Sequence, residues 1–162
     1  MMPANVNGTQ VQLLIDTGSG LSSISQKAVD VLKLKPQATD WQSYDLYGNM
    51  SQQFVSLDTL QVGPLKAKNL HLMIWPNPGL SSDGLIGGDI LSHYDVELNF
   101  VARKLNLFSP DHCEGKVIYW PATAGAIVPF SMRRPSAGDT DIHVPITVDG
   151  KDLQAIIDTG RQ

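Results

Sequence analysis

The chain has 162 residues, of which 42% are hydrophobic and 17% charged, with a formal net charge of −4 at pH 7. Its twelve Lys and Arg residues are scattered, so no basic stripe is present to neutralise a phosphate backbone, and we expect no nucleic-acid partner. No apolar stretch approaches the ~20 residues of a membrane-spanning helix, so no span is expected. Fourteen glycines and ten prolines interrupt the chain at intervals typical of short strands, which favours a strand-rich globular protein.

The first predicted element is a hairpin. Asn7-Gly8 is a dipeptide that favours a two-residue type I′ turn, because both central residues of that turn need a positive φ. The strand after the turn is an apolar run that ends at Ile15. Because this run lacks strict alternation, we expect burial on both of its faces.

A short helix is predicted next, over residues 26–34, with Ser25 as its N-cap. Residues 41–47 and 50–62 then flank Gly48-Asn49, which predicts a long hairpin. Residues 65–75 form another strand candidate. The two prolines at 76 and 78 predict a loop over residues 75–79, since proline removes a backbone donor and fixes φ.

The remaining elements are shorter. Residues 83–91 predict an apolar strand that ends in glycines and opens a helix reaching about His93, with Asp89 near the amino end of that helix. Residues 96–100 and 104–108 predict a second hairpin. From 111 to 141 the chain is expected to be irregular, with possible short strands at residues 117–120 and 127–130.

An internal repeat is the most informative feature of the sequence. Residues 6–18 reappear as residues 148–160, without a gap and with the same turn glycine, the same glutamine and the same terminal Asp-Thr-Gly. Asp149-Gly150 predicts the same type of hairpin as Asn7-Gly8. We interpret the two copies as a duplicated structural unit in which Asp16 and Asp158 each follow a strand directly.

A third motif, Leu85-Ile86-Gly87, combines two apolar residues with a glycine. Together with the two strand-linked Asp-Thr-Gly triplets, it is similar to the aspartic protease superfamily, and the compactness of the unit resembles the retropepsin-like branch and its bacterial, tandem-lobed relatives. The resemblance covers residues 3–109 and restarts near residue 142. It implies an all-β fold: a retropepsin-like acid protease barrel with one or two short helices.

The resemblance also implies roles for individual residues. Asp16 and Asp158 are expected to be the catalytic carboxylates. The active-site loops are expected to comprise Thr17, Gly18, Ser19, Thr159 and Gly160. The tip Tyr47, Gly48 and Asn49 corresponds to the flap that covers the substrate, and Leu85, Ile86 and Gly87 correspond to the segment that braces the active-site loop. Arg161 departs from the small residue that the family has after its triplet.

Paired aspartates suit peptide hydrolysis because one carboxylate activates water as a base while its protonated partner acts as an acid. Two such groups share a proton and titrate as a coupled pair; aspartic proteases are the standard example of this behaviour. We therefore expect an aspartic endopeptidase that acts on peptide or protein substrates at acidic pH. No metal or organic cofactor is required.

Three parts of the chain are predicted: a protease lobe over residues 1–110, a linker over 111–141, and the start of a second, truncated lobe over 142–162. In the intact protein Asp16 would pair with Asp158, and a chain with an incomplete second lobe need not be active by itself. The competing arrangement is a homodimer in which Asp16 of two subunits forms the pair. By resemblance alone, we expect an exported, periplasmic or membrane-tethered bacterial protein.

Two other functions are compatible with parts of the sequence. A peptide-binding module with a protease fold and no turnover is the main alternative, because a cation at Arg161 would favour ionised Asp158 and disturb proton sharing. Glycoside hydrolysis also uses paired acids but has no further support here. Cys113 and the four histidines lack the spacing of a metal site.

Overall fold

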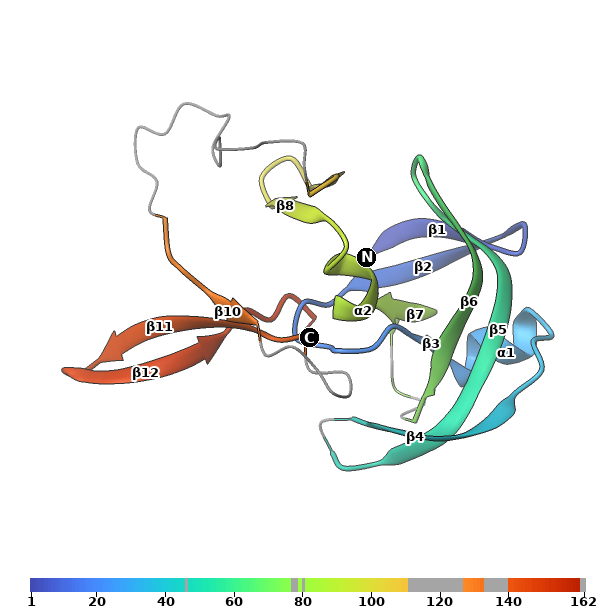
Figure 1. Ribbon diagram of the computed structural model, residues 1–162. Coiled ribbons are helices and arrows are strands. Elements are labelled where there is room, and N and C mark those ends of the chain that lie inside the picture. The colour runs from blue at the N-terminus through green and yellow to red at the C-terminus, as the bar shows by residue number, and fades with distance from the viewer. Residues whose placement is uncertain (46, 77–78, 80, 111–126, 133–139, 161–162) are drawn as a thin grey trace.

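The computed structural model describes residues 1–45, 47–76, 79, 81–110, 127–132 and 140–160. Figure 1 shows a barrel from which hairpins project. The two helices are α1 (Gln26–Val31) and α2 (Gly88–Leu91). The strands are β1 (Met2–Val6), β2 (Thr9–Ile15), β3 (Ser23–Ser25), β4 (Gln37–Tyr44), β5 (Met50–Val62), β6 (Leu65–Trp75), β7 (Gly84–Ile86), β8 (Asp95–Asn99), β9 (Lys104–Phe108), β10 (Ser131–Met132), β11 (Ile142–Val148) and β12 (Lys151–Ile156).

The largest sheet closes on itself. Its strand order is β1-β2-β7-β3-β6-β5-β4, and an additional pairing between β1 and β5 leaves a closed six-stranded barrel with β4 attached outside it. Pairings β2–β7 and β3–β6 are parallel, whereas the other pairings in this sheet are antiparallel. Closure removes free strand edges from the barrel. The predicted all-β fold with one or two short helices is confirmed.

The predicted turns are present in both copies of the repeat. Asn7 and Gly8 have φ values of 49° and 88°, and Asp149 and Gly150 have values of 51° and 75°. Both central residues therefore occupy the left-handed region that a type I′ turn requires. The first turn is also bound to the barrel, since the backbone N–H of Thr59 donates to Oδ1 of Asn7 at 2.9 Å.

Helix α1 is capped as predicted but ends earlier. The backbone N–H of Ala28 donates to Oγ of Ser25 at 3.1 Å, which satisfies one free amide of the first turn. The helix ends at Val31 because Lys33 adopts a φ of 53° and Leu34 donates its N–H back to the carbonyl of Val29. This left-handed turn redirects the chain towards β4.

Two strand predictions need correction. Strand β4 begins at Gln37 rather than at residue 41, because Gln37 pairs with Phe54 across the hairpin, ahead of an irregularity in the register. No strand forms at residues 127–130; within the described segment 127–132, Ser131 and Met132 alone pair with β11. The other candidate strand, residues 117–120, lies outside the described residues.

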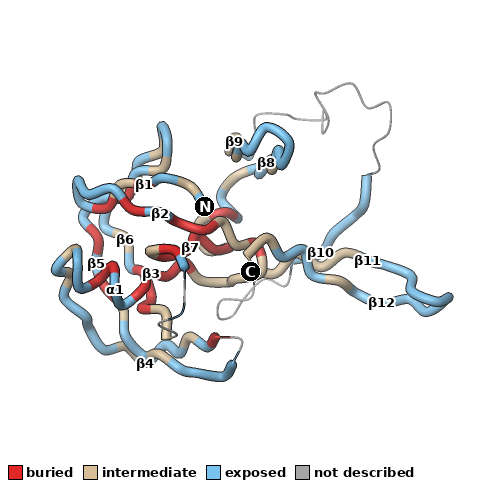
Figure 2. Tube along the Cα trace, turned by 180° about the vertical axis from the view of Figure 1, so that it is seen from behind, coloured by how far each residue is buried: buried red, intermediate tan, exposed pale blue. Residues whose placement is uncertain are grey.

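Burial differs sharply between the two copies of the repeated strand. In the first copy β2 lies between β1 and β7, and Leu14 is only 8% exposed. In the second copy β12 pairs with β11 alone among the described residues, and Ile156, the counterpart of Leu14, is 47% exposed. Figure 2 shows that the residues of the β11–β12 hairpin are exposed or intermediate, whereas the buried residues gather in the barrel. In β2, burial on both faces is limited to the adjacent Leu13 and Leu14, since Gln12 is exposed, and β12 has no buried residue. The expected burial on both faces therefore holds for the end of β2 and not for β12.

Within the part of the chain that the structure describes, no helix has both the length and the apolar character needed to cross a membrane.

The unequal burial predicts unequal costs for matched substitutions. Leu14→Ala should lower the free energy of unfolding by about 2–5 kcal/mol, because it leaves a cavity beside β7. Ile156→Ala at the repeat-equivalent position should cost about 0.5 kcal/mol or less, because the side chain is already half in water. Urea unfolding of both variants tests this, and equal losses would contradict the different environments of the two strands.

Candidate active site

Asp16 lies directly after β2, where the barrel fixes its backbone. Parallel pairing of β2 with β7 ends at Ile15 and Ile86, and the N–H of Asp16 then donates to the carbonyl of Ile86 at 3.0 Å. The carboxylate folds back over its own loop, and its Oδ1 accepts from the N–H of Gly18 at 3.0 Å. The sheet and the loop therefore both orient this carboxylate.

Asp158 repeats this local geometry after β12. Its Oδ1 accepts from the N–H of Gly160 at 2.8 Å. The hairpin that leads to it is aligned by the β11–β12 ladder, and the N–H of Ile157 donates to the carbonyl of Ile142 at 3.0 Å. The two Asp-Thr-Gly triplets thus form equivalent loops.

The two loops are joined through their threonines. Oγ1 of Thr17 donates to the carbonyl of Ile157 at 2.6 Å, and Oγ1 of Thr159 donates to the carbonyl of Ile15 at 2.9 Å. Each hydroxyl also accepts from the opposite threonine's backbone N–H at 3.2 Å. Every bond in this set has an equivalent bond in the other copy, so the loops are related by an approximate two-fold axis.

This junction places the two carboxylates against the opposite glycines. A Cβ added to Gly18 would lie 2.6 Å from Cγ of Asp158, and a Cβ added to Gly160 would overlap the carboxylate of Asp16. Neither position has space for a larger residue. The glycine of each triplet is therefore required by the close approach of the other loop's acid.

The pKa of the Asp16 carboxyl is raised above its usual range. Partial burial is the largest cause, because it disfavours the charged form. The Gly18 N–H acts in the opposite direction, while the charge of Asp158 and a hydrogen bond with Asp158 raise the pKa further. Burial and the neighbouring acid therefore both favour the protonated form of Asp16.

The predicted bracing segment lies against the first loop. Leu85 and Ile86 are buried in β7. Behind them, a Cβ on Gly87 would lie 2.6 Å from the carbonyl oxygen of Ser19, and the N–H of Gly88 donates to that same oxygen at 2.8 Å. The segment therefore contacts the loop through backbone groups, which explains the need for glycine.

Sequence reasoning missed a polar link between this segment and the loop. Oδ1 of Asp89 accepts from both the N–H and the Oγ of Ser22, at 2.9 and 2.5 Å. The same Oγ accepts from the N–H of Gly87 at 3.0 Å. Asp89 was predicted only as an acid at a helix start, and no sequence signal links it to a serine 67 residues away.

The predicted flap residues lie at the tip of the β4–β5 hairpin, which projects from the barrel (Figure 1). Tyr47 is 82% exposed, Asn49 is also exposed, and Gly48 adopts a φ of 79°. Tyr47 is therefore a solvent-facing aromatic side chain. Arg161 lies outside the described residues.

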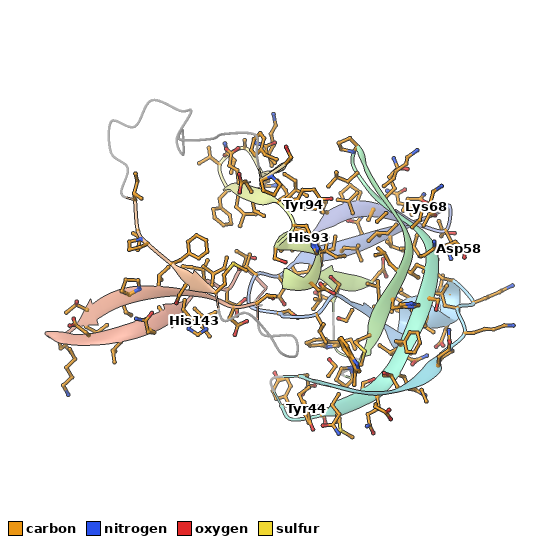
Figure 3. The ribbon with its side chains drawn as sticks, viewed as in Figure 1. Tyr44, Asp58, Lys68, His93, Tyr94 and His143 are labelled. Atoms are coloured by element: carbon orange, nitrogen blue, oxygen red, sulfur yellow. The ribbon has the colours of Figure 1, made fainter. Side chains whose placement is uncertain are left out.

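Metal binding has no candidate site in the described ranges, where no group of three or more His, Cys, Asp or Glu side chains could ligate an ion. His71 packs edge-on against the ring of Phe54, with centroids 5.1 Å apart, and its Nδ1 lies 3.2 Å from Oγ of Ser56. His143 lies on β11 (Figure 3). Cys113 and His112 lie outside the described residues.

Comparison with known proteins gave three results. A family model described as "Aspartyl protease" matches residues 2–90. No curated protein matches. Among solved structures, the crystal structure of a retropepsin-like aspartic protease from Rickettsia conorii matches with 18% identity and a TM-score of 0.45, covering 65% of this chain and 79% of that chain.

The matched family segment contains the barrel strands, the loop of Asp16 and the bracing segment, and it spans more than half of the sequence. The chain accordingly belongs to the aspartyl protease family.

Proposed function

We propose that the chain provides the site of a retropepsin-like aspartic endopeptidase in which Asp16 and Asp158 act as a pair. The observation that carries the proposal is the reciprocal bonding of Thr17 and Thr159, which brings two Asp-Thr-Gly loops together in one chain. The raised pKa of Asp16 adds support, since a proton retained by the pair supplies the acid that amide hydrolysis needs.

The proposed reaction requires only the two carboxyl groups and water. The ionised carboxylate removes a proton from the water, and the oxygen of the water attacks the peptide carbonyl carbon. At the same time the protonated carboxyl donates its proton to the carbonyl oxygen. The carboxyl that took the water proton then gives it to the amide nitrogen, while the other carboxylate takes a hydroxyl proton from the tetrahedral intermediate. The C–N bond breaks, which leaves a carboxylic acid and an amine. The pair returns to its singly protonated state, so protons and electrons balance.

The remaining predicted residues receive supporting roles in this proposal. Thr17, Thr159, Gly18 and Gly160 set the distance between the acids, and Ser19 continues the first loop. Leu85, Ile86 and Gly87 brace that loop from behind. Tyr47, Gly48 and Asn49 form a flap that covers an extended peptide and adds to its binding.

Pairing within one chain is favoured over pairing between subunits. The hydroxyls of Thr17 and Thr159 are already engaged with each other's loops, and each Asp-Thr-Gly glycine already abuts the opposite aspartate. A homodimer built around two copies of Asp16 would have to break these contacts first. We therefore place the proposed site within a single subunit.

Cleavage should depend on both acids. Asp16→Asn and Asp158→Asn should each lower kcat/KM by at least about 10²–10⁴-fold, the usual contribution of a general acid or base. Asp58→Asn, an exposed change on β5, serves as the control and should leave the rate unaltered. Digestion of a mixed peptide library between pH 3 and 7, followed by mass spectrometry, measures the effect.

Full activity in either variant would reject the pair as catalytic. Peptide affinity that is retained without any cleavage by the wild-type protein would instead identify a binding module with a protease fold.

The dependence of the cleavage rate on protein concentration should show whether the pair of acids forms within one chain or between two subunits. For a pair within one chain, the initial rate divided by protein concentration should stay constant between nanomolar and micromolar protein. Analytical ultracentrifugation over the same range should find no dimerisation linked to activity. A rate that rises with the square of protein concentration would support the homodimer instead.

The raised pKa of Asp16 predicts a pH-dependent stability difference. Between the unfolded and folded pKa values the folded protein binds more protons than the unfolded chain, so its free energy of unfolding falls as pH rises through that window. Asp16→Asn removes this penalty while its Oδ1 still accepts from Gly18. The Tm of the variant minus that of the wild type should therefore be larger at pH 7 than at pH 3. A difference that stays constant or shrinks would contradict the raised pKa.

A further inference from the structure

The tip of the β4–β5 hairpin is organised by one carboxylate that the sequence analysis did not single out. Oδ1 of Asp45 accepts from the N–H of Tyr47 and the N–H of Asn49, both at 2.9 Å. Oδ2 accepts from the side-chain Nδ2 of Asn49 at 2.8 Å. One side chain thus binds three donors of the tip.

Backbone bonds close the same turn. The N–H of Asp45 donates to the carbonyl of Asn49 at 3.0 Å, and the N–H of Gly48 donates to the carbonyl of Asp45 at 3.1 Å. Gly48 lies in the left-handed region, where a glycine has no steric cost. The described residues of the tip are therefore held together by hydrogen bonds that meet at Asp45.

Among the residues of the tip that the structure describes, apolar packing contributes little. Asp45 is only 8% exposed, whereas Tyr44, Tyr47 and Met50 around it are exposed side chains. Figure 3 places Tyr44 on the projecting hairpin, well away from Asp58 and Lys68 at the other side of the barrel. A buried acceptor inside an exposed tip means that these bonds, rather than a hydrophobic cluster, order it.

We propose that Asp45 is a positioning residue for peptide binding: its carboxylate fixes the tip so that Tyr47 and Gly48 are already arranged to close over an extended peptide. This inference rests on the proposed function of the hairpin as a flap. A tip that is ordered before binding loses less conformational entropy when it closes, so the benefit appears as affinity for the peptide. The acids at Asp16 and Asp158 are not involved, so the chemical step is unaffected.

The chemistry of the bonds suggests a matched set of variants. Asp45→Ala removes all three acceptor contacts. Asp45→Asn keeps an oxygen for the two backbone N–H groups but faces the Asn49 amide with a second donor. The exchange Asp45→Asn with Asn49→Asp restores a donor and an acceptor across the turn in reversed order. Asp58→Ala removes an exposed carboxylate from the same strand, β5, at a distance from the tip, and is the control.

The experiment combines peptide kinetics with amide hydrogen exchange at Tyr47 and Asn49. Asp45→Ala should raise KM about five- to tenfold with kcat within about twofold, and exchange at both amides should accelerate at least about tenfold. The KM of Asp45→Asn should lie between the KM of Asp45→Ala and that of the wild type. The double variant Asp45→Asn with Asn49→Asp should have a KM within about twofold of wild type. The Tm should be unchanged in all variants because the barrel core is untouched.

The outcomes separate this inference from the proposed function. Unchanged KM in Asp45→Ala beside an active wild type overturns the positioning role and leaves the protease proposal intact. If the wild type cleaves no peptide, the protease proposal fails, and dissociation constants for a fluorescein-labelled peptide mixture replace KM. Weaker binding by Asp45→Ala then supports the positioning role, and equal binding overturns it. Unchanged exchange at Tyr47 and Asn49 in Asp45→Ala also overturns it.

Discussion

The candidate site depends on the hydrogen bonds that Thr17 and Thr159 exchange across the two loops. Each hydroxyl donates to the carbonyl that precedes the opposite aspartate and accepts from the opposite threonine's amide. A threonine hydroxyl can donate once and accept at its lone pairs, so it satisfies a carbonyl and an amide of the other loop at the same time. These groups would otherwise be polar atoms in a partly buried junction, where an unsatisfied donor or acceptor is costly. The junction therefore fixes the spacing of the loops and, with it, the approach of the two acids.

The close approach of the two acids explains why each triplet ends in glycine and why the pKa of Asp16 is raised. Gly18 and Gly160 each face the carboxylate of the opposite loop at a distance that leaves no room for a Cβ. Partial burial together with the neighbouring acid raises the pKa of Asp16, although the Gly18 amide opposes the shift. Proximity and partial desolvation thus have the same origin, namely the threonine-linked packing of two equivalent turns. The barrel contributes by anchoring the first turn through Ile86 and through the backbone contacts of Gly87 and Gly88 with Ser19.

The two copies of the repeat show how far one local sequence can differ in environment. Both turns have the same pair of positive φ values, because Asn-Gly and Asp-Gly favour that conformation whatever surrounds them. Burial is not shared. Leu14 is covered because β7 pairs alongside β2, whereas Ile156 remains exposed beside a strand that pairs with β11 alone among the described residues. The apolar run correctly predicted a strand in both copies, but its side chains are buried only in β2, where a second neighbouring strand is present.

The sequence by itself determined the local features: the two type I′ turns, the Ser25 cap, the bounds of β6 and the equivalence of Asp16 and Asp158. Each depends on residues close together in the chain, whose backbone preferences act without tertiary help. The tertiary structure alone decided the closure of the barrel through β1 and β5, the bond of Asp89 to Ser22, the coverage of β2, and the cross-bonding of the threonines. These contacts join residues tens to more than a hundred positions apart, and no periodicity or turn preference encodes such a partner. Asp45 lies between the two cases: its bonds are local, but only the folded hairpin turned its carboxylate towards the three donors of the tip.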